Sequence, residues 1–196
     1  MNANILTALA VALLSAAVTP AQGVTPTKVV IFAPWSSSGL RAGFRVASKV
    51  HGSCWIHSIA RNRADAWRCM AGNDIYDPCF AGSPQKNIVA CPEGPFSNDV
   101  VLLHDAKPLD GKPDWIVRRL QPKGQPWALR LTNGDTCAFE TGATDVVGGQ
   151  RMNYACAKSG WIVGFVNRSS KSWTAESVSA PGDKHLKRLT VAAALY

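Results

Sequence analysis

A short stretch around the first cysteine carries side chains that could bind a metal ion. His51, Cys54 and His57 follow one another at intervals of three residues, and Cys69 lies further along the chain. Imidazole nitrogens and thiolates are the usual ligands of structural zinc. An oxidising compartment converts thiols to disulfides, however, and strand alternation would point Cys54 and His57 to opposite faces. We therefore predict no metal site and no bound cofactor.

The same cysteine has neighbours that suggest a nucleophile. The string Gly52-Ser53-Cys54-Trp55 resembles the sequence around the reactive cysteine of papain-like proteases. That family places its cysteine at the start of a long helix with a Gln several residues upstream, whereas position 48 here is Ser and the residues after Cys54 alternate like a strand. A cysteine in a disulfide cannot attack a substrate, so we predict a structural role for Cys54.

The histidines and the charge leave an enzymatic alternative open. The chain has 21 Lys and Arg against 13 Asp and Glu, a formal charge of +8. His51, His57, His104 and His185 could include the general acid and base of a small secreted hydrolase of the nuclease type. No Asp or Glu stands at a recognisable spacing from them, so exposed or core histidines are the simpler interpretation. We leave open whether the chain is an enzyme and favour binding.

Basic residues that recur beside aromatic residues suggest the binding of an anion. Cations neutralise an anionic polymer while aromatic rings stack on it. The candidate residues lie on two predicted strands, 115–120 and the one beginning at Trp127, and on the Pro- and Gly-rich loop between them; they are Arg118, Arg119, Lys123 and Arg130. Adjacent strand residues face opposite sides of a sheet, so one of the first two would point away from the site. A protein partner is the alternative ligand.

The N-terminus has the pattern of a signal peptide. Ile5 to Val18 is an uncharged apolar run, and Pro20 ends it before the roughly 20 apolar residues that a membrane-spanning helix needs. Small residues follow where signal cleavage requires them. We predict a signal peptide over residues 1–23 and a single β-rich domain over residues 24–196, secreted or periplasmic, with no integral membrane span after signal removal.

All six cysteines follow the predicted signal peptide. Thiols of an exported protein are oxidised in pairs, so the even number predicts three disulfides and no free thiol. Six cysteines allow 15 connectivities. Sequential pairing, in which each bridge closes a short loop, is our preferred interpretation; the bridges are then Cys54–Cys69, Cys79–Cys91 and Cys137–Cys156.

Most of the chain has the pattern of short β-strands. Runs of this kind occupy 28–32, 53–59, 100–104, 115–120, 127–139, 151–157, 161–167, 172–179 and 188–195. Asn133-Gly134 predicts a type I′ hairpin, and Asn62 predicts the cap of a short helix over residues 63–70. The predicted fold class is therefore all-β, an antiparallel sandwich or small barrel with one short helix, stapled by disulfides.

Charged residues between the first cysteines suggest an ion-paired cluster rather than a reactive site. Three arginines and three aspartates are close enough in sequence to neutralise one another. They are Arg61, Arg63, Arg68, Asp65, Asp74 and Asp77.

The stretch from Gly52 to Phe80 resembles an uncharacterised family of exported bacterial proteins. The shared pattern is Gly-Ser-Cys-Trp, then Asp-Ala-Trp-Arg-Cys-Met, then Asp-Pro-Cys-Phe, and the resemblance continues around Cys137 and Cys156. It implies a bacterial envelope or extracellular setting and assigns no catalytic residue.

The composition limits the class of protein. With 46% hydrophobic and 17% charged residues, the chain is too apolar for a disordered protein and too poor in charge for a coiled coil. We predict a secreted, disulfide-stabilised binding module of the cell envelope or extracellular space, for an anionic polymer or a protein partner.

Overall fold

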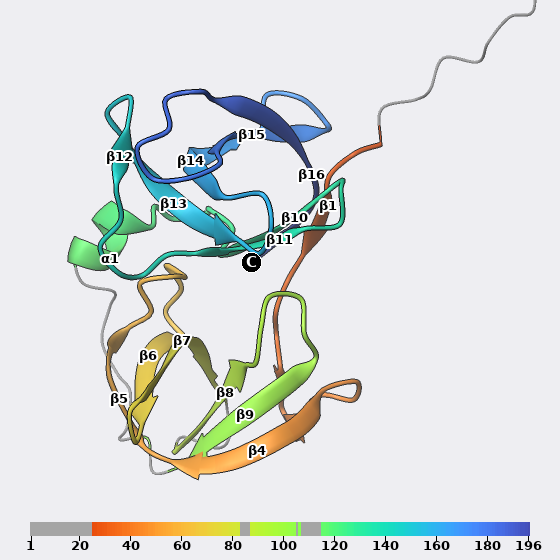
Figure 1. Ribbon diagram of the computed structural model, residues 1–196. Coiled ribbons are helices and arrows are strands. Elements are labelled where there is room, and N and C mark those ends of the chain that lie inside the picture. Colours follow the sequence, from red (N-terminus) through yellow and green to blue (C-terminus); the bar gives the residue numbers. More distant parts are fainter. Residues whose placement is uncertain (1–24, 83–86, 105, 107–114) are drawn as a thin grey trace, which may run out of the picture.

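The strands form two groups that follow each other along the chain. The computed structural model describes residues 25–82, 87–104, 106 and 115–196, so the predicted signal peptide lies outside the described residues. Figure 1 shows the earlier group, β4 to β9, below the later group, β10 to β16. We call them the N-terminal sheet and the C-terminal barrel. The predicted all-β class with one short helix is confirmed.

The C-terminal barrel is a closed meander. Its strands are β10 (Ala128–Leu131), β11 (Thr136–Phe139), β13 (Gln150–Cys156), β14 (Trp161–Asn167), β15 (Trp173–Val178) and β16 (Lys187–Leu195). Each strand pairs antiparallel with the next, and β16 pairs with β10. An even number of alternating strands brings the last strand antiparallel to the first, so the ring closes without a parallel pair. Two short strands extend it: β1 (Lys28–Val30) runs parallel to β16, and β12 (Val146–Val147) pairs with β13.

The N-terminal sheet curls back on itself (Figure 1). Its strands are β4 (Arg45–His51), β5 (Ser53–His57), β6 (Ala66–Ala71), β7 (Asp74–Ala81), β8 (Ile88–Pro92) and β9 (Asp99–His104). The edge strands β4 and β5 are joined by Gly52 alone, where a Cβ would lie 2.1 Å from the Met70 carbonyl oxygen. The chain runs on from β4 into β5 in the same general direction. Because β5 to β9 alternate in direction, β9 also runs in this direction, and it therefore pairs with β4 in parallel. A small hairpin of β2 (Trp35–Ser36) and β3 (Gly39–Leu40) precedes the sheet.

One hydrophobic cluster joins the two groups of strands. Phe32 lies between them: its ring centroid is 5.0 Å from that of Phe80 in the N-terminal sheet and 6.1 Å from that of Trp127 beside the C-terminal barrel. All three side chains are buried in the same cluster. The junction of the two groups is therefore a packed interior, and side chains at its rim have fixed surroundings.

The three disulfides connect neighbouring strands. Sequential pairing is confirmed: the bridges are Cys54–Cys69, Cys79–Cys91 and Cys137–Cys156, and they leave no free cysteine. The first bridge joins β5 to β6 and the third joins β11 to β13, each at directly opposed residues. The second links β7 to β8, two strands that the sequence analysis did not predict. Disulfides of this number are typical of proteins that fold outside the reducing cytosol.

Two secondary-structure predictions are wrong. The predicted helix over residues 63–70 is instead mostly strand β6, because the backbone there pairs with β5 on one side and β7 on the other. The predicted strand over residues 115–120 is instead the helix α1 (Trp115–Leu120). Both segments are short, and at this length pairing or packing outweighs the small differences in intrinsic propensity.

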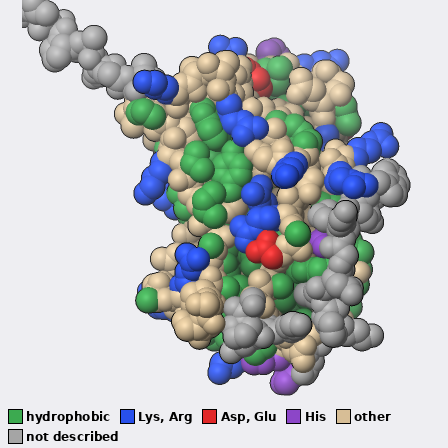
Figure 2. Space-filling model, turned by 180° about the vertical axis from the view of Figure 1, so that it is seen from behind, with side chains coloured by type: hydrophobic (Ala, Val, Ile, Leu, Met, Phe, Trp, Pro, Cys, Tyr) green, Lys and Arg blue, Asp and Glu red, His purple; other side chains and the backbone are tan. Residues whose placement is uncertain are grey.

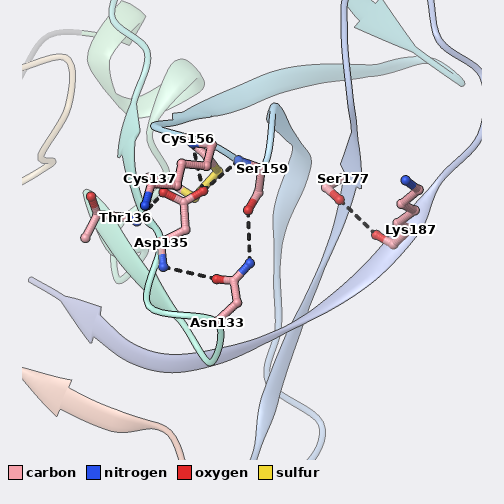
Figure 3. The surroundings of a disulfide bond; sticks show 9 residues. Asn133, Asp135, Thr136, Cys137, Cys156, Ser159, Ser177 and Lys187 are labelled. Atoms are coloured by element: carbon pink, nitrogen blue, oxygen red, sulfur yellow. Dashed lines mark hydrogen bonds between the residues drawn. A yellow bond between two sulfur atoms is a disulfide. The ribbon is translucent and has the colours of Figure 1, made fainter.

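The predicted β10–β11 hairpin is confirmed, with a different turn. Only Gly134 of the Asn133-Gly134 pair has a positive φ, 84°, whereas a type I′ turn needs positive φ at both residues. The backbone N–H of Gly134 donates to the Leu131 carbonyl, and that of Leu131 donates to the Asp135 carbonyl. This pattern fits a three-residue loop that ends with a glycine in the left-handed region. Figure 3 shows the loop beside the Cys137–Cys156 disulfide.

Candidate functional site

The structure separates the four basic residues that the sequence analysis grouped together. Arg118 and Arg119 are exposed on α1 rather than on a strand, so that part of the prediction is wrong. Lys123 is exposed in the segment after the helix. Arg130 is exposed on β10, where its guanidinium carbon lies 4.4 Å from the ring centroid of Phe96. Arg119 and Lys123 line two different cavities, and only the cavity of Lys123 gathers several further cations.

We call the cavity of Lys123 the junction cavity. Its volume is about 370 Å³, and it lies where the segment after β5 meets the segment after α1. The lining residues are Arg61, Asn62, Arg63, Ala64, Lys123 and Gly124. Figure 2 shows Lys and Arg side chains gathered midway along this face of the molecule, beside one acidic side chain. Three of the six lining residues are thus cationic.

Arg61 is held by contacts that leave part of its guanidinium unused. Its Nη1 donates to the Gln125 carbonyl at 2.7 Å, and its guanidinium carbon lies 5.2 Å from the ring centroid of Tyr196. Its Nε is buried and has no hydrogen-bond partner among the described residues. Burial lowers the pKa of Arg61, and the neighbouring charge of Arg63 lowers it further. The negative charge of an anion bound in the cavity would favour the charged form of Arg61, which burial and the charge of Arg63 disfavour.

Among the residues that the structure describes, Arg63 is the one lining cation with a carboxylate partner. Its Nε and Nη2 donate to the two oxygens of Asp65 at 2.5 and 2.6 Å, and its Nη1 donates to the Phe32 carbonyl at 3.0 Å. The guanidinium carbon lies 4.4 Å from the ring centroid of Phe80. Asp65 therefore compensates one positive charge of the cavity and fixes the Arg63 side chain in place.

The segment that carries Lys123 is fixed from both sides. On one side, the buried Gln121 donates from Nε2 to the carbonyls of Ala60 at 2.9 Å and Pro126 at 3.2 Å. On the other side, Arg168 of the β14–β15 loop donates from Nη1 to the Gly124 carbonyl at 2.9 Å. Arg168 thereby brings a fourth positive charge to the rim of the cavity. Rigid surroundings of this kind reduce the entropy lost on binding.

The arrangement can bind an oxyanion. A guanidinium presents a planar fork of N–H groups that matches carboxylate and phosphate oxygens, and a lysine amine adds a mobile charge. Like charges held close together repel each other, so an anion between them is stabilised by several cations at once. The described residues contain no group of three or more His, Cys, Asp and Glu that could hold a metal ion.

The other residues that suggested chemistry lie elsewhere. The sulfur of Cys54 is bonded to Cys69, so it is not available for nucleophilic attack or zinc binding. The His185 side chain is 94% exposed, with Nδ1 3.2 Å from an oxygen of Asp183. The ring centroids of His51 and His104 lie 6.0 Å apart at the ends of β4 and β9. The lining of the junction cavity includes no histidine.

The remaining histidine, His57, packs within the N-terminal sheet. It is buried, and its ring stacks on that of Trp67 in the neighbouring strand β6 with the centroids 3.9 Å apart. His57 therefore packs inside the N-terminal sheet and does not line the junction cavity.

Another cavity, about 670 Å³ in volume, is lined by the carboxylates of Asp74, Asp77 and Glu93, and the buried one, Asp77, is already hydrogen-bonded. Asp77 accepts hydrogen bonds from the Ser58 hydroxyl, from the backbone N–H of Ile59 at 3.2 Å and from Arg68 at 2.9 Å. Burial raises the pKa of Asp77, and the bonds from Ser58 and Arg68 act against that rise. Together with the Arg63–Asp65 pair, the Arg68–Asp77 pair confirms part of the predicted ion-paired cluster.

Comparison with known proteins gives no family for this chain. No family model matches it, and neither do any curated protein or any solved structure. No described helix has the length and apolar character needed to cross a membrane. The geometry alone therefore defines the class of this protein. It is a disulfide-linked β-protein with a basic cavity at the junction of two sheets.

Proposed function

We propose that the protein is an exported binding module whose junction cavity takes an anionic group of a polymer from the cell envelope or the extracellular space. The observation that carries the proposal is the convergence of Arg61, Arg63 and Lys123 on one cavity, with Arg168 at its rim and Asp65 as the carboxylate partner. Because these cations come from distant parts of the chain, only the folded protein presents them together.

The chemistry of the lining supports binding rather than catalysis. Arginine and a solvent-exposed lysine such as Lys123 keep their charge at physiological pH and serve poorly as general acids or bases, whereas they hold oxyanions well. The three disulfides and the signal-like N-terminus support an exported location, secreted or periplasmic. A polymer partner fits because several weak ionic contacts on one chain add up to useful affinity.

The test is binding of polyphosphate and polygalacturonate, two anionic polymers with different backbones, across a range of salt concentrations. Lys123→Glu should weaken binding to both polymers and reduce the slope of log affinity against log salt by about one. Lys49→Glu is the matched control, because Lys49 is an equally exposed lysine on β4 outside the cavity. Equal effects of the two substitutions would contradict the proposal, as would affinity that does not change with salt.

A further inference from the structure

A second cavity, which we call the helix cavity, is lined in part by α1, the helix that precedes Lys123 in the chain. Its volume is about 400 Å³. It is lined by Arg119 and Leu120 of α1, by Gln150, Arg151 and Asn153 of β13, and by Phe165 of β14. Like the junction cavity, it combines cations with a side-chain amide, but it has two amides, those of Gln150 and Asn153, and it adds an aromatic ring.

The Arg151 charge in the helix cavity is held in place. Its Nη2 donates to the carbonyls of Glu140 and Gly142, both at 2.7 Å, and its Nη1 donates to Oδ1 of Asn153 at 3.1 Å. The guanidinium carbon also lies 5.4 Å from the ring centroid of Phe139. Arg119 adds an exposed positive charge from the helix. The cavity can therefore attract an anionic group of its own.

The amides and the ring match a sugar. A Cβ on Gly164 would lie 2.0 Å from Oε1 of Gln150, so the missing side chain leaves room for that amide at the cavity wall. Side-chain amides both donate and accept, as sugar hydroxyls do. Phe165 is partly buried and nearly parallel to Phe139, at 7° and with the centroids 6.5 Å apart. Phe165 therefore offers partly exposed apolar surface to the C–H groups of a sugar in the cavity.

The two cavities are close enough for one ligand. Leu120 lines the helix cavity and Lys123 lines the junction cavity, and three residues of backbone span at most about 11 Å. The buried Gln121 between them is fixed by its hydrogen bonds to Ala60 and Pro126, so their spacing is fixed as well. A flexible polymer that fills one cavity therefore meets the other at high effective concentration.

We infer that the two cavities are subsites for one acidic glycan. The junction cavity binds one anionic group, and the helix cavity binds a sugar ring and a second anionic group of the same chain. This inference rests on the proposed function of the junction cavity and adds the class of the polymer.

The experiment measures the affinities of monogalacturonate, tetragalacturonate and tripolyphosphate for the mature chain and its variants. Tetragalacturonate should bind more tightly than the monomer because it reaches both cavities. Gln150→Ala and Arg119→Glu should each weaken tetragalacturonate binding about tenfold and leave tripolyphosphate binding almost unchanged. Lys123→Glu should weaken both ligands, and Lys49→Glu should weaken neither.

The outcomes separate this inference from the proposed function. If Lys123→Glu weakens tetragalacturonate binding but Gln150→Ala and Arg119→Glu do not, the glycan subsite is wrong and the anion site stands. If Lys123→Glu changes neither ligand, the proposed function itself is wrong. Oligothymidylate serves as the nucleic-acid probe: if it binds as tightly as tetragalacturonate and responds to Gln150→Ala in the same way, the assignment to a glycan is overturned.

Discussion

Arg61 and Gln125 connect the two groups of strands through a 2.7 Å hydrogen bond from the Arg61 Nη1 to the Gln125 carbonyl. Arg61 follows β5 of the N-terminal sheet, and Gln125 belongs to the segment that leads into β10 of the C-terminal barrel. The bond therefore places the guanidinium at the junction, where its buried Nε has no hydrogen-bond partner among the described residues. The basic character of the junction cavity follows from how the two groups of strands pack together.

Replacing Asp135 should destabilise the C-terminal barrel. The carboxylate accepts hydrogen bonds from the backbone N–H groups of Thr136 at 2.8 Å, Lys158 at 3.0 Å and Ser159 at 2.6 Å (Figure 3). An amide in its place would turn an N–H group toward one of these donors. We expect Asp135→Asn to lower the free energy of unfolding by about 1–3 kcal/mol at pH 7, measured by urea denaturation.

The effect of Asp135→Asn should also depend on pH. Burial acts to raise the pKa of Asp135, but the hydrogen bonds from Ser159, Lys158 and Thr136 together lower it. A carboxyl whose pKa is lower in the folded state than in the unfolded state stabilises the fold above its unfolded pKa of about 4 and loses this contribution as the pH falls through the folded value. The difference between wild type and variant should therefore shrink at pH 3. A constant difference would contradict this assignment.

Gly134 should resist substitution because of its backbone conformation. Its φ is 84°, and nothing lies within 4 Å of the position that a Cβ would take, so the expected cost comes from the backbone rather than from a clash. We expect Gly134→Val to lower the free energy of unfolding by more than about 1 kcal/mol in thermal unfolding. Gly142→Val is the control, since Gly142 has equally open surroundings without a positive φ. A neutral Gly134→Val would mean that the loop relaxes to another turn.

Removing the Cys137–Cys156 bridge should lower the stability of the protein and leave its fold unchanged. The bridge spans 19 residues and joins directly opposed positions of β11 and β13. The double substitution Cys137→Ser with Cys156→Ser should lower the free energy of unfolding by about 3 kcal/mol. In the unmodified protein, alkylation under denaturing, non-reducing conditions should label no thiol. A labelled thiol would show that one of the three bridges does not form.

The buried pair of Arg68 and Asp77 should matter more than an exposed pair. Their side chains are 15% and 3% exposed, and Asp77→Ala would leave the Arg68 charge without its carboxylate. We expect Asp77→Ala to lower the free energy of unfolding by about 3–5 kcal/mol. Asp99→Ala breaks the exposed Arg45–Asp99 pair and serves as the control, which should change stability far less. Similar losses for the two variants would show that burial does not set the contribution of the Arg68–Asp77 pair.

Local sequence signals predicted most of the C-terminal barrel. Strand β14 has the predicted bounds, because turn residues flank its apolar run on both sides. The same signals failed at β6, where the spacing of Ala64 and Trp67 fits a helix as well as a strand and only the pairing with β5 and β7 decides. At α1, the Val and Ile of a six-residue segment suggested a strand, although Asp114, a residue type common at helix starts, stands just before it.

The candidate site was only partly predictable. Lys123 was identified from the Pro- and Gly-rich loop, whereas Arg61 and Arg63 were assigned to an ion-paired cluster and Arg168 was missed. Arg168 and Lys123 are 45 positions apart in the chain, and they meet because Arg168 donates to the carbonyl of Gly124. No sequence spacing reports such a contact. In the sequence, Arg168 is recognisable only as a cation near a turn, between Asn167 and Ser169.

The most direct test of the anion site is an NMR titration of the arginine Nε–Hε signals of the protein with tripolyphosphate. Arg61 lines the cavity and has no carboxylate partner among the described residues, so the charge of a bound anion should shift its signal first and furthest, followed by that of Arg63, which Asp65 already pairs. The signals of Arg45 and Arg188, which lie in exposed ion pairs outside the cavity, should stay in place. An unmoved Arg61 signal, or equal shifts at Arg45 and Arg61, would contradict a binding site at the junction cavity.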